Sequence, residues 1–192
     1  MTNPFMPPIK VTRRILGLDP ATVTGFAHSN GEHGIWDLNN GPRHEGGRFA
    51  WLRSRILEVH ATWGIDLIAF EESSLGAGGT REGGPQWSTI VFHNKVRGVV
   101  EEVACSLQVD LLPVNPATLK AFATGSGRAK KPDMIRALER HFGIRVVDDN
   151  EADAIWVLKY AQQYQSRPVE MMRPKAKRKA ARKAIQKSRK LF

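Results

Sequence analysis

The sequence predicts a mixed α/β sheet flanked by helices, and the order of its apolar segments is the evidence. Three short apolar runs, each followed by turn residues, open the chain at residues 14–18, 24–28 and 34–38. Two further runs, at 65–70 and 109–114, alternate with segments of helical spacing. Strands first, and then strands alternating with helices, are typical of an antiparallel meander continued by parallel strands.

The helices are predicted from apolar residues that recur every three or four positions and from prolines near their ends. In residues 47–63, for example, Phe49, Leu52 and Ile56 fall on one face. The predicted helices are residues 47–63, 87–108, 132–142 and 151–165, with a shorter helical turn at 117–122. Residues 74–86 contain six Gly or Pro residues, which predicts a loop.

The positive charge of the chain is concentrated in its C-terminal segment. The formal net charge is +10 over 192 residues. Residues 166–192 hold eleven of the 29 Lys and Arg residues and one of the 19 acids, which leaves 18 of each kind for residues 1–165. We therefore predict a flexible leader over residues 1–12, a folded domain over 13–165 and a disordered basic tail over 166–192. Such a tail favours a polyanionic partner, and nucleic acid fits better than a membrane because the tail lacks a bulky apolar face.

Several classes of protein are excluded by what the sequence lacks. It contains no run of eighteen apolar residues that could span a membrane, and its proline-containing N-terminus has no apolar signal-peptide core. The single cysteine, Cys105, cannot form an internal disulfide, and we expect it to be buried and inert. These features are typical of a protein of the reducing cytoplasm.

Three acidic residues stand where α/β proteins place functional sites. Asp19 and Glu71 each follow a predicted strand, and Asp153 lies near the start of the last predicted helix. Strand ends meet at the rim of a sheet, and carboxylate oxygens are the ligands that Mg²⁺ prefers. Each acid also has an ordinary explanation. Asp19 could form a turn before Pro20, Glu71 could be a solvated residue at a strand end, and Asp153 could be a favourable charge at a helix N-terminus.

Five segments taken together resemble the RuvC-type Holliday-junction resolvases, which are crossover junction endodeoxyribonucleases of the RNase H-like superfamily. They follow the family's order over roughly residues 13–165, about four-fifths of the chain. The segments are ILGLDPATVTGFA (15–27), IDLIAFEES (65–73), FHNKVRGVVEEVA (92–104), VNPATLKAFATGSGRAKK (114–131) and NEADAIWV (150–157). The resemblance implies an RNase H-like fold and a Mg²⁺-dependent endonuclease.

The resemblance also implies which residues bind the metal. Asp19, Glu71 and Asp153 match the family's metal-binding acids, which would hold two Mg²⁺ ions that Mn²⁺ can replace. The family's fourth ligand falls at Asn150, whose amide oxygen carries no charge, and Asp149 is the alternative. Three matched carboxylates rather than four leave the affinity for the second ion open.

Basic residues near the last two segments are expected to contact DNA. By the resemblance, Lys131 stabilises the negative charge that develops at the cleaved phosphate, and Lys120 binds a phosphate nearby. The alternative for both is a solvated surface lysine. Arg128 and Lys130, which lie close to Lys131 in the sequence, are expected to contact the sugar-phosphate backbone of the DNA.

Base contacts cannot be carried over from the family. The aromatic residue that the family places three positions after its second acid is Ser74 here. Trp87 follows the glycine-rich loop and could stack on DNA bases in its place. We expect Trp87 to pack into the core instead, as a Trp at the start of a helix more often does.

The tail is expected to follow the DNA backbone and to add affinity without reading sequence. The residues expected to contact DNA are Lys175, Lys177, Arg178, Lys179, Arg182 and Lys183. A solubilising tail and a contact with an acidic protein are the alternatives.

These interpretations predict an enzyme that cleaves branched DNA, with four-way (Holliday) junctions as the expected substrate and paired symmetric nicks as the result. Because such a junction is two-fold symmetric, we expect a homodimer, to which the helix at 87–108 could contribute. Alternatives are a nuclease of the same fold that cuts flaps or forks, and a non-catalytic protein that binds branched DNA. An actin-like ATPase is a distant alternative because GLDPATVTG resembles its opening strand pair, but a second phosphate loop is missing and no nucleotide cofactor is expected. A short resolvase with its own basic arm would suit a bacteriophage, acting in the cytoplasm of its bacterial host.

Overall fold

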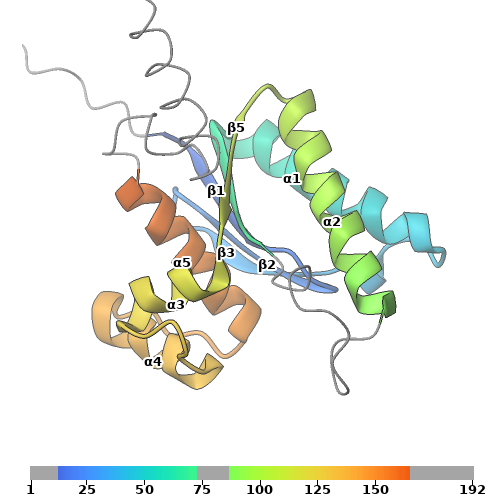
Figure 1. Cartoon of the computed structure of the whole chain (residues 1–192). Helices are drawn as coiled ribbons and strands as arrows, with labels where there is room; N and C mark the ends of the chain where they lie inside the picture. The colour runs from blue at the N-terminus through green and yellow to red at the C-terminus, as the bar shows by residue number, and fades with distance from the viewer. Residues whose placement is uncertain (1–12, 73–86, 165–192) are drawn as a thin grey trace, which may run out of the picture. The chain divides into compact units, whose positions relative to one another are not determined.

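The computed structural model describes residues 13–72 and 87–164, which contain a five-stranded mixed sheet. Its strands are β1 (Ile15–Asp19), β2 (Val23–His28), β3 (His33–Asp37), β4 (Leu67–Glu71) and β5 (Asp110–Val114). They lie in the order β3-β2-β1-β4-β5, in which the pairs among β1, β2 and β3 are antiparallel and those among β1, β4 and β5 are parallel (Figure 1). The predicted meander followed by parallel strands is confirmed.

Helices cover both faces of this sheet. Those of the described residues are η1 (Leu38–Asn40), α1 (Glu45–Trp63), α2 (Trp87–Ser106), α3 (Pro116–Thr124), α4 (Lys131–Phe142) and α5 (Asp149–Tyr164). Helices α1 and α2 lie on one face and α3, α4 and α5 on the other (Figure 1). The helical turn predicted at 117–122 is a longer helix, because the side chain of Asn115 caps its start and Gly125, at φ 83°, ends it.

Alternation along the central strands divides the buried side chains between two cores. Leu18 of β1 and Phe70 of β4 pack with α1 and α2, whereas Ile15 and Ala69 pack with α3, α4 and α5. Since successive residues of a strand point to opposite faces, each residue's place in this pattern decides which helical layer it meets.

Two expectations about burial are wrong. Cys105 is exposed, because the face of α2 that enters the core is formed by other residues, among them Val100 and Val103. Trp87 is 75% exposed, because it opens α2 ahead of the buried part of that helix. The leader at 1–12, the loop predicted at 74–86 and the tail lie outside the described residues. None of the helices that the structure describes has the length and apolar composition needed to cross a membrane.

Candidate active site

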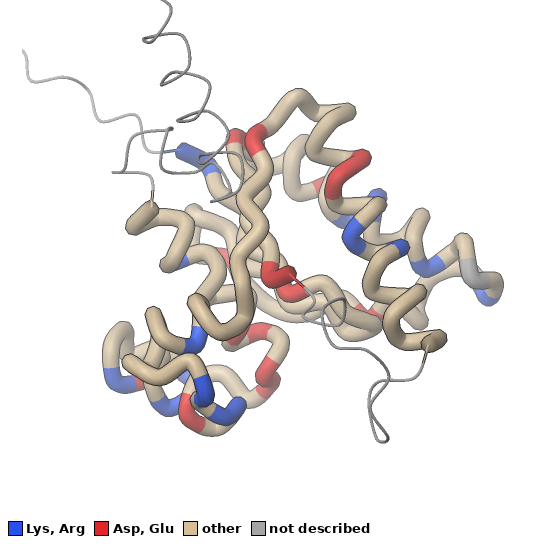
Figure 2. The backbone as a smooth tube through the Cα atoms, viewed as in Figure 1, with Lys and Arg blue, Asp and Glu red and all other residues tan. Residues whose placement is uncertain are grey.

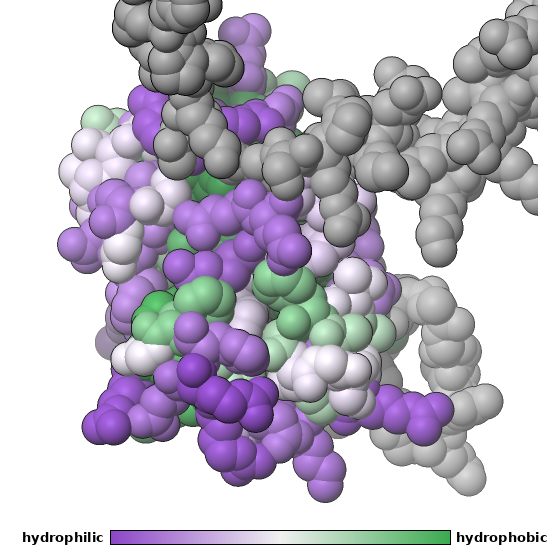
Figure 3. Space-filling view, turned by 90° about the vertical axis from the view of Figure 1, so that its left-hand side faces the viewer, coloured by the Kyte–Doolittle hydropathy of each residue, from purple (hydrophilic) through white to green (hydrophobic). Residues whose placement is uncertain are grey.

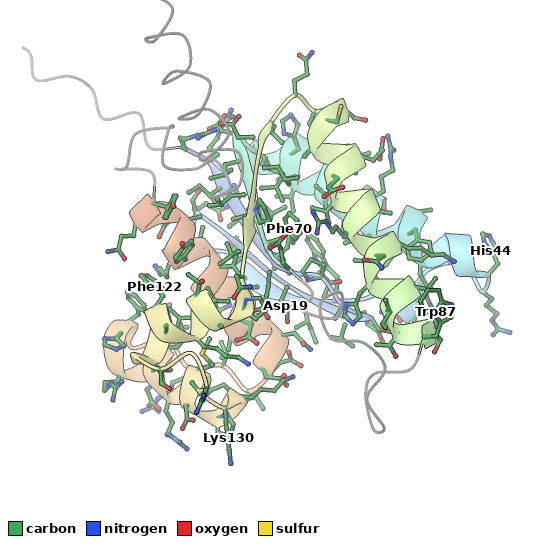
Figure 4. All side chains as sticks on the ribbon, viewed as in Figure 1. Asp19, His44, Phe70, Trp87, Phe122 and Lys130 are labelled. Carbon is green, nitrogen blue, oxygen red and sulfur yellow. The ribbon has the colours of Figure 1, made fainter. Side chains whose placement is uncertain are left out.

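Asp19 and Glu71 end neighbouring strands of the sheet. Asp19 is the last residue of β1 and Glu71 the last of β4, and these parallel strands pair in register up to Leu18 opposite Phe70. Leu18 and Phe70 both point to the α1–α2 core. The next residue of each strand therefore points the other way, toward α5. Asp19 lies near the middle of the view in Figure 4.

A glycine on β2 lets helix α5 approach these strand ends closely. A Cβ atom on Gly25 would lie 1.9 Å from the carbonyl oxygen of Asn150, so no larger residue fits there without moving the helix. Gly25 is also the register partner of Asp19. The first turn of α5 is thereby held beside Asp19, and one turn further along the helix Asp153 is buried at 8% exposure. The structure thus brings the three predicted acids to one end of the sheet.

The pKa values of all three carboxyl groups are raised, and at Asp19 and Glu71 the neighbouring acids contribute to the rise. Burial is the largest cause for each, raising the pKa of Glu71 to about 7, that of Asp153 to about 6 and that of Asp19 well above its usual value. Repulsion from Glu71 and Asp153 adds to the rise at Asp19, and repulsion from Asp153 adds to the rise at Glu71. Carboxylates that share a site shielded from water repel one another, and a bound cation relieves that repulsion.

Asp153 also carries an acceptor atom that is left unused. Its Oδ1 is buried and has no hydrogen-bond partner in the described part of the chain. A buried polar atom without a partner is costly, and carboxylate oxygen is the donor type that Mg²⁺ and Mn²⁺ accept. The chemistry and burial of these acids therefore fit a divalent cation.

The acids do not, however, surround one common point. Within residues 13–72 and 87–164, no group of three or more His, Cys, Asp or Glu side chains is placed to hold a single ion. Asp19, Glu71 and Asp153 are nonetheless the carboxylates that would hold a divalent cation, because each is shielded from water and their charges act on one another. The fit to metal therefore rests on the chemistry and burial of these acids and not on a preformed three-ligand site.

Two of the predicted basic residues reach this cluster. Lys131 lowers the pKa of all three acids, and Lys120 lowers the pKa of Glu71 and Asp153. Lys131 is the first residue of α4 and forms an ion pair with Asp149. Both lysines thus contribute positive charge at the carboxylates; Lys120 is half-buried and Lys131 is exposed.

The first residues of α5 include both candidates for the fourth metal ligand, Asn150 and Asp149. Asn150 lies one turn before Asp153, whereas Asp149 is engaged by Lys131. Asp148 was not identified from the sequence, but its charge raises the pKa of Asp19. Its Oδ1 accepts hydrogen bonds from the backbone N–H groups of Asn150 at 2.8 Å and of the following residue at 3.2 Å. An aspartate just before a predicted helix is a typical N-cap, and that signal could have found it.

The remaining predicted DNA contacts lie apart from the acids or beyond the described residues. Arg128 and Lys130 are exposed on the connection from α3 to α4. Basic and acidic positions are mixed around α4, whereas the positions at the strand ends in the middle of the view are acidic (Figure 2). Ser74 and the six basic residues of the tail lie outside the described part of the chain.

The sheet order and the two helical layers define an RNase H-like α/β fold, and solved structures agree. A structure of RuvC from Thermus thermophilus is 18% identical, with a TM-score of 0.61 over 80% of this chain and 96% of that one. RuvC of the same organism in complex with a Holliday junction substrate is also 18% identical, with a TM-score of 0.63 over 79% and 96%. The yeast mitochondrial Holliday junction resolvase Ydc2 is 14% identical, with a TM-score of 0.54 over 83% and 81%.

The chain therefore has the fold of RuvC, as its sequence predicted. At these identities the likeness shows the fold alone. No protein-family model matches the chain, and no curated protein matches it in sequence.

Proposed function

We propose that this protein is a divalent-metal-dependent endonuclease that cleaves branched DNA, with four-way junctions as its preferred substrate. The observation that carries the proposal is the meeting of Asp19, Glu71 and buried Asp153 at one end of a RuvC-like sheet. The Thermus thermophilus protein of this fold has been solved with a Holliday junction substrate. The shared fold, together with the carboxylates and nearby lysines of this chain, supports a similar substrate class here.

Each residue of the cluster has a distinct part in this proposal. Asp19, Glu71 and Asp153 would hold the Mg²⁺ ions through their carboxylates, and Asn150 would add a neutral oxygen ligand. Bound Mg²⁺ supplies the charge that activates water and stabilises the leaving oxygen of a phosphodiester. Lys131 would place its ammonium near the cleaved phosphate, where it offsets developing negative charge.

The proposal includes a homodimer, because two matched nicks across a two-fold symmetric junction require two sites. Helix α2 was one candidate for the contact. Its residues Val96, Val100 and Val103 are buried in the α1–α2 core, so a contact through α2 would have to use its outer face.

The test compares cleavage of a four-way junction, a Y-fork and a linear duplex by the purified chain in Mg²⁺. We expect the junction to be cut fastest, by two symmetric nicks, and Asp19→Asn protein to bind it without cutting. Faster cutting of the fork would favour the flap or fork nuclease. Equal rates on all three would refute structure selectivity, and an Asp19→Asn protein that cuts at the normal rate would refute the site.

A non-catalytic protein that binds branched DNA is the second candidate. It is favoured by the missing three-ligand arrangement among the described residues and by an uncharged residue at position 150. Calorimetric titration with Mg²⁺ and Mn²⁺ separates the two candidates. Binding that is lost in Asp19→Asn supports the nuclease, and no binding of either ion supports the second candidate.

A further inference from the structure

A basic hollow lies at the connection between α3 and α4, and the catalytic proposal does not use it. Its volume is about 410 Å³, and its lining includes four cationic side chains and one carboxylate. The cations are Arg128, Lys130, Arg136 and Arg140, and the carboxylate is Asp133. Figure 3 shows hydrophilic residues gathered along the lower part of the face on which α4 lies. We call this feature the α4 hollow.

The charges of the α4 hollow are only partly balanced within the chain. Arg136 forms an ion pair with Asp133. Among the described residues, no carboxylate pairs with Arg128, Lys130 or Arg140. Cations held close together repel one another, and an anion bound between them relieves that repulsion. Guanidinium groups also match phosphate oxygens through two parallel hydrogen bonds.

The α4 hollow is separate from the acid cluster, although the two are neighbours. Arg140 follows Lys131 by nine residues, which at about 100° per residue places it roughly half a turn around the helix. Lys131 acts on the acids, whereas the preceding residue, Lys130, lines the hollow. The start of α4 thus stands between the two features, and the hollow is on the far side of that helix from the cleavage chemistry.

The residues that line the α4 hollow favour one kind of phosphate-bearing ligand over another. It consists of hydroxyl, charged and alanine side chains and contains no aromatic or large apolar residue. A nucleotide site normally offers an apolar surface to the base. A sugar-phosphate backbone needs only the cations, so the chemistry favours the backbone over a free nucleotide.

We propose that the α4 hollow binds the sugar-phosphate backbone of a DNA arm beyond the cleaved phosphodiester, with Arg136 and Arg140 as its principal contacts. This inference rests on the proposed action on branched DNA and adds a second contact region to it. Because Arg136 and Arg140 point away from the acids, they contribute to affinity and not to the chemical step.

The test uses the full chain with Arg136→Gln/Arg140→Gln and measures binding to a four-way junction over a range of salt concentrations. Loss of two phosphate contacts should flatten the slope of log K against log salt by about 2. The ratio of the unmodified protein's affinity to that of the variant should then fall by about tenfold between 50 and 200 mM salt. Cleavage at saturating DNA should keep its rate.

Arg53→Gln/Arg145→Gln is the matched control, because it removes the same charge from two exposed arginines that do not line the hollow and that pair with Glu102 and Glu139. Its salt slope should stay close to that of the unmodified protein. Equal slopes for the test variant and the unmodified protein, or equal losses in test and control variants, would overturn the inference. A lower cleavage rate at saturation would also overturn it, because it would place these arginines in the chemistry. If the unmodified protein binds no branched DNA, the proposed function itself fails, and that outcome is visible before any variant is made.

Discussion

The carbonyl oxygen of Asn150 lies directly against Gly25, 1.9 Å from where a Cβ atom at position 25 would stand. Gly25 pairs with Asp19 across β1 and β2, and Asn150 precedes Asp153 by one helical turn. A single close contact between strand and helix therefore sets the distance between acids that are more than a hundred residues apart in the chain.

Replacing Gly25 with alanine should damage both stability and activity. The added methyl group would meet backbone, which cannot rotate away, so α5 must shift; we expect a loss of roughly 3 kcal/mol in the free energy of unfolding and a large loss of cleavage. Gly98→Ala is the control, because nothing lies within 4 Å of its added Cβ and alanine favours a helix by up to about 1 kcal/mol. Urea unfolding measures both variants. A Gly25→Ala protein as stable as the parent would contradict the close contact.

The acid cluster should make the metal-free protein less stable as pH rises. In the fold the pKa of Asp153 is about 6 and that of Glu71 about 7, above their usual values of 3.8 and 4.5. On account of these two acids the native state binds more protons than the unfolded state between about pH 4 and 7, so the free energy of unfolding falls as the pH rises across that window. Urea unfolding in a chelator at several pH values measures this decline.

Two changes should reduce the destabilisation at pH 8. Asp19→Asn removes one of the mutually repelling charges and should be more stable than the parent in the chelator. Added Mg²⁺ should stabilise the parent but have little effect on Asp19→Asn, since a ligand stabilises only the state that binds it. If the free energy of unfolding in the chelator does not change with pH, then burial and repulsion do not raise the pKa values of these acids.

The fourth ligand can be identified by exchanging charge at the start of α5. Asn150→Asp should tighten Mn²⁺ binding, because it adds a carboxylate one turn from Asp153. Asp149→Asn should change metal affinity little, because Asp149 is already paired with Lys131. Calorimetry compares the two variants with the parent. Weaker Mn²⁺ binding in Asp149→Asn than in Asn150→Ala would instead make Asp149 the ligand.

Lys131 should act on the rate of cleavage more than on binding. Lys131→Gln removes the ammonium that lies at the acids, and loss of one such charge-stabilising group typically lowers kcat by about 10²-fold. Single-turnover cleavage at saturating junction DNA isolates this effect from affinity. Lys159→Gln is the control, because the Lys159 ammonium lies over the ring of Phe142, 4.8 Å from its centre. If both variants cut at similar rates, Lys131 is an ordinary surface lysine.

The basic tail should contribute affinity that depends steeply on salt. If it neutralises about five phosphates, truncation before Ser166 should flatten the slope of log K against log salt by roughly 4 to 5. Binding of the truncated and full chains to the same junction over a salt series gives the two slopes. An unchanged slope would remove the tail from the DNA interface and favour a solubilising role.

The sequence by itself determined the order and type of the elements, because the two- and three-to-four-residue periodicities of buried side chains are local properties. It also placed Asp19 and Glu71 at strand ends, since each follows a continuous apolar run. Two local details were predicted wrongly. Asn115 and Gly125 cap a helix, α3, that is longer than the predicted turn. Trp87 is exposed because it begins α2 before that helix reaches the core.

Only the tertiary structure decided that Asp19, Glu71 and Asp153 meet. Their meeting depends on β1 lying between β2 and β4 and on the space that Gly25 leaves for α5, and no local pattern encodes either. The raised pKa values of the acids and the grouping of distant cations around the α4 hollow follow from the same arrangement. Burial and electrostatic interaction depend on what the rest of the chain brings near a residue, so they are settled by long-range packing and not by the residue's immediate neighbours in sequence.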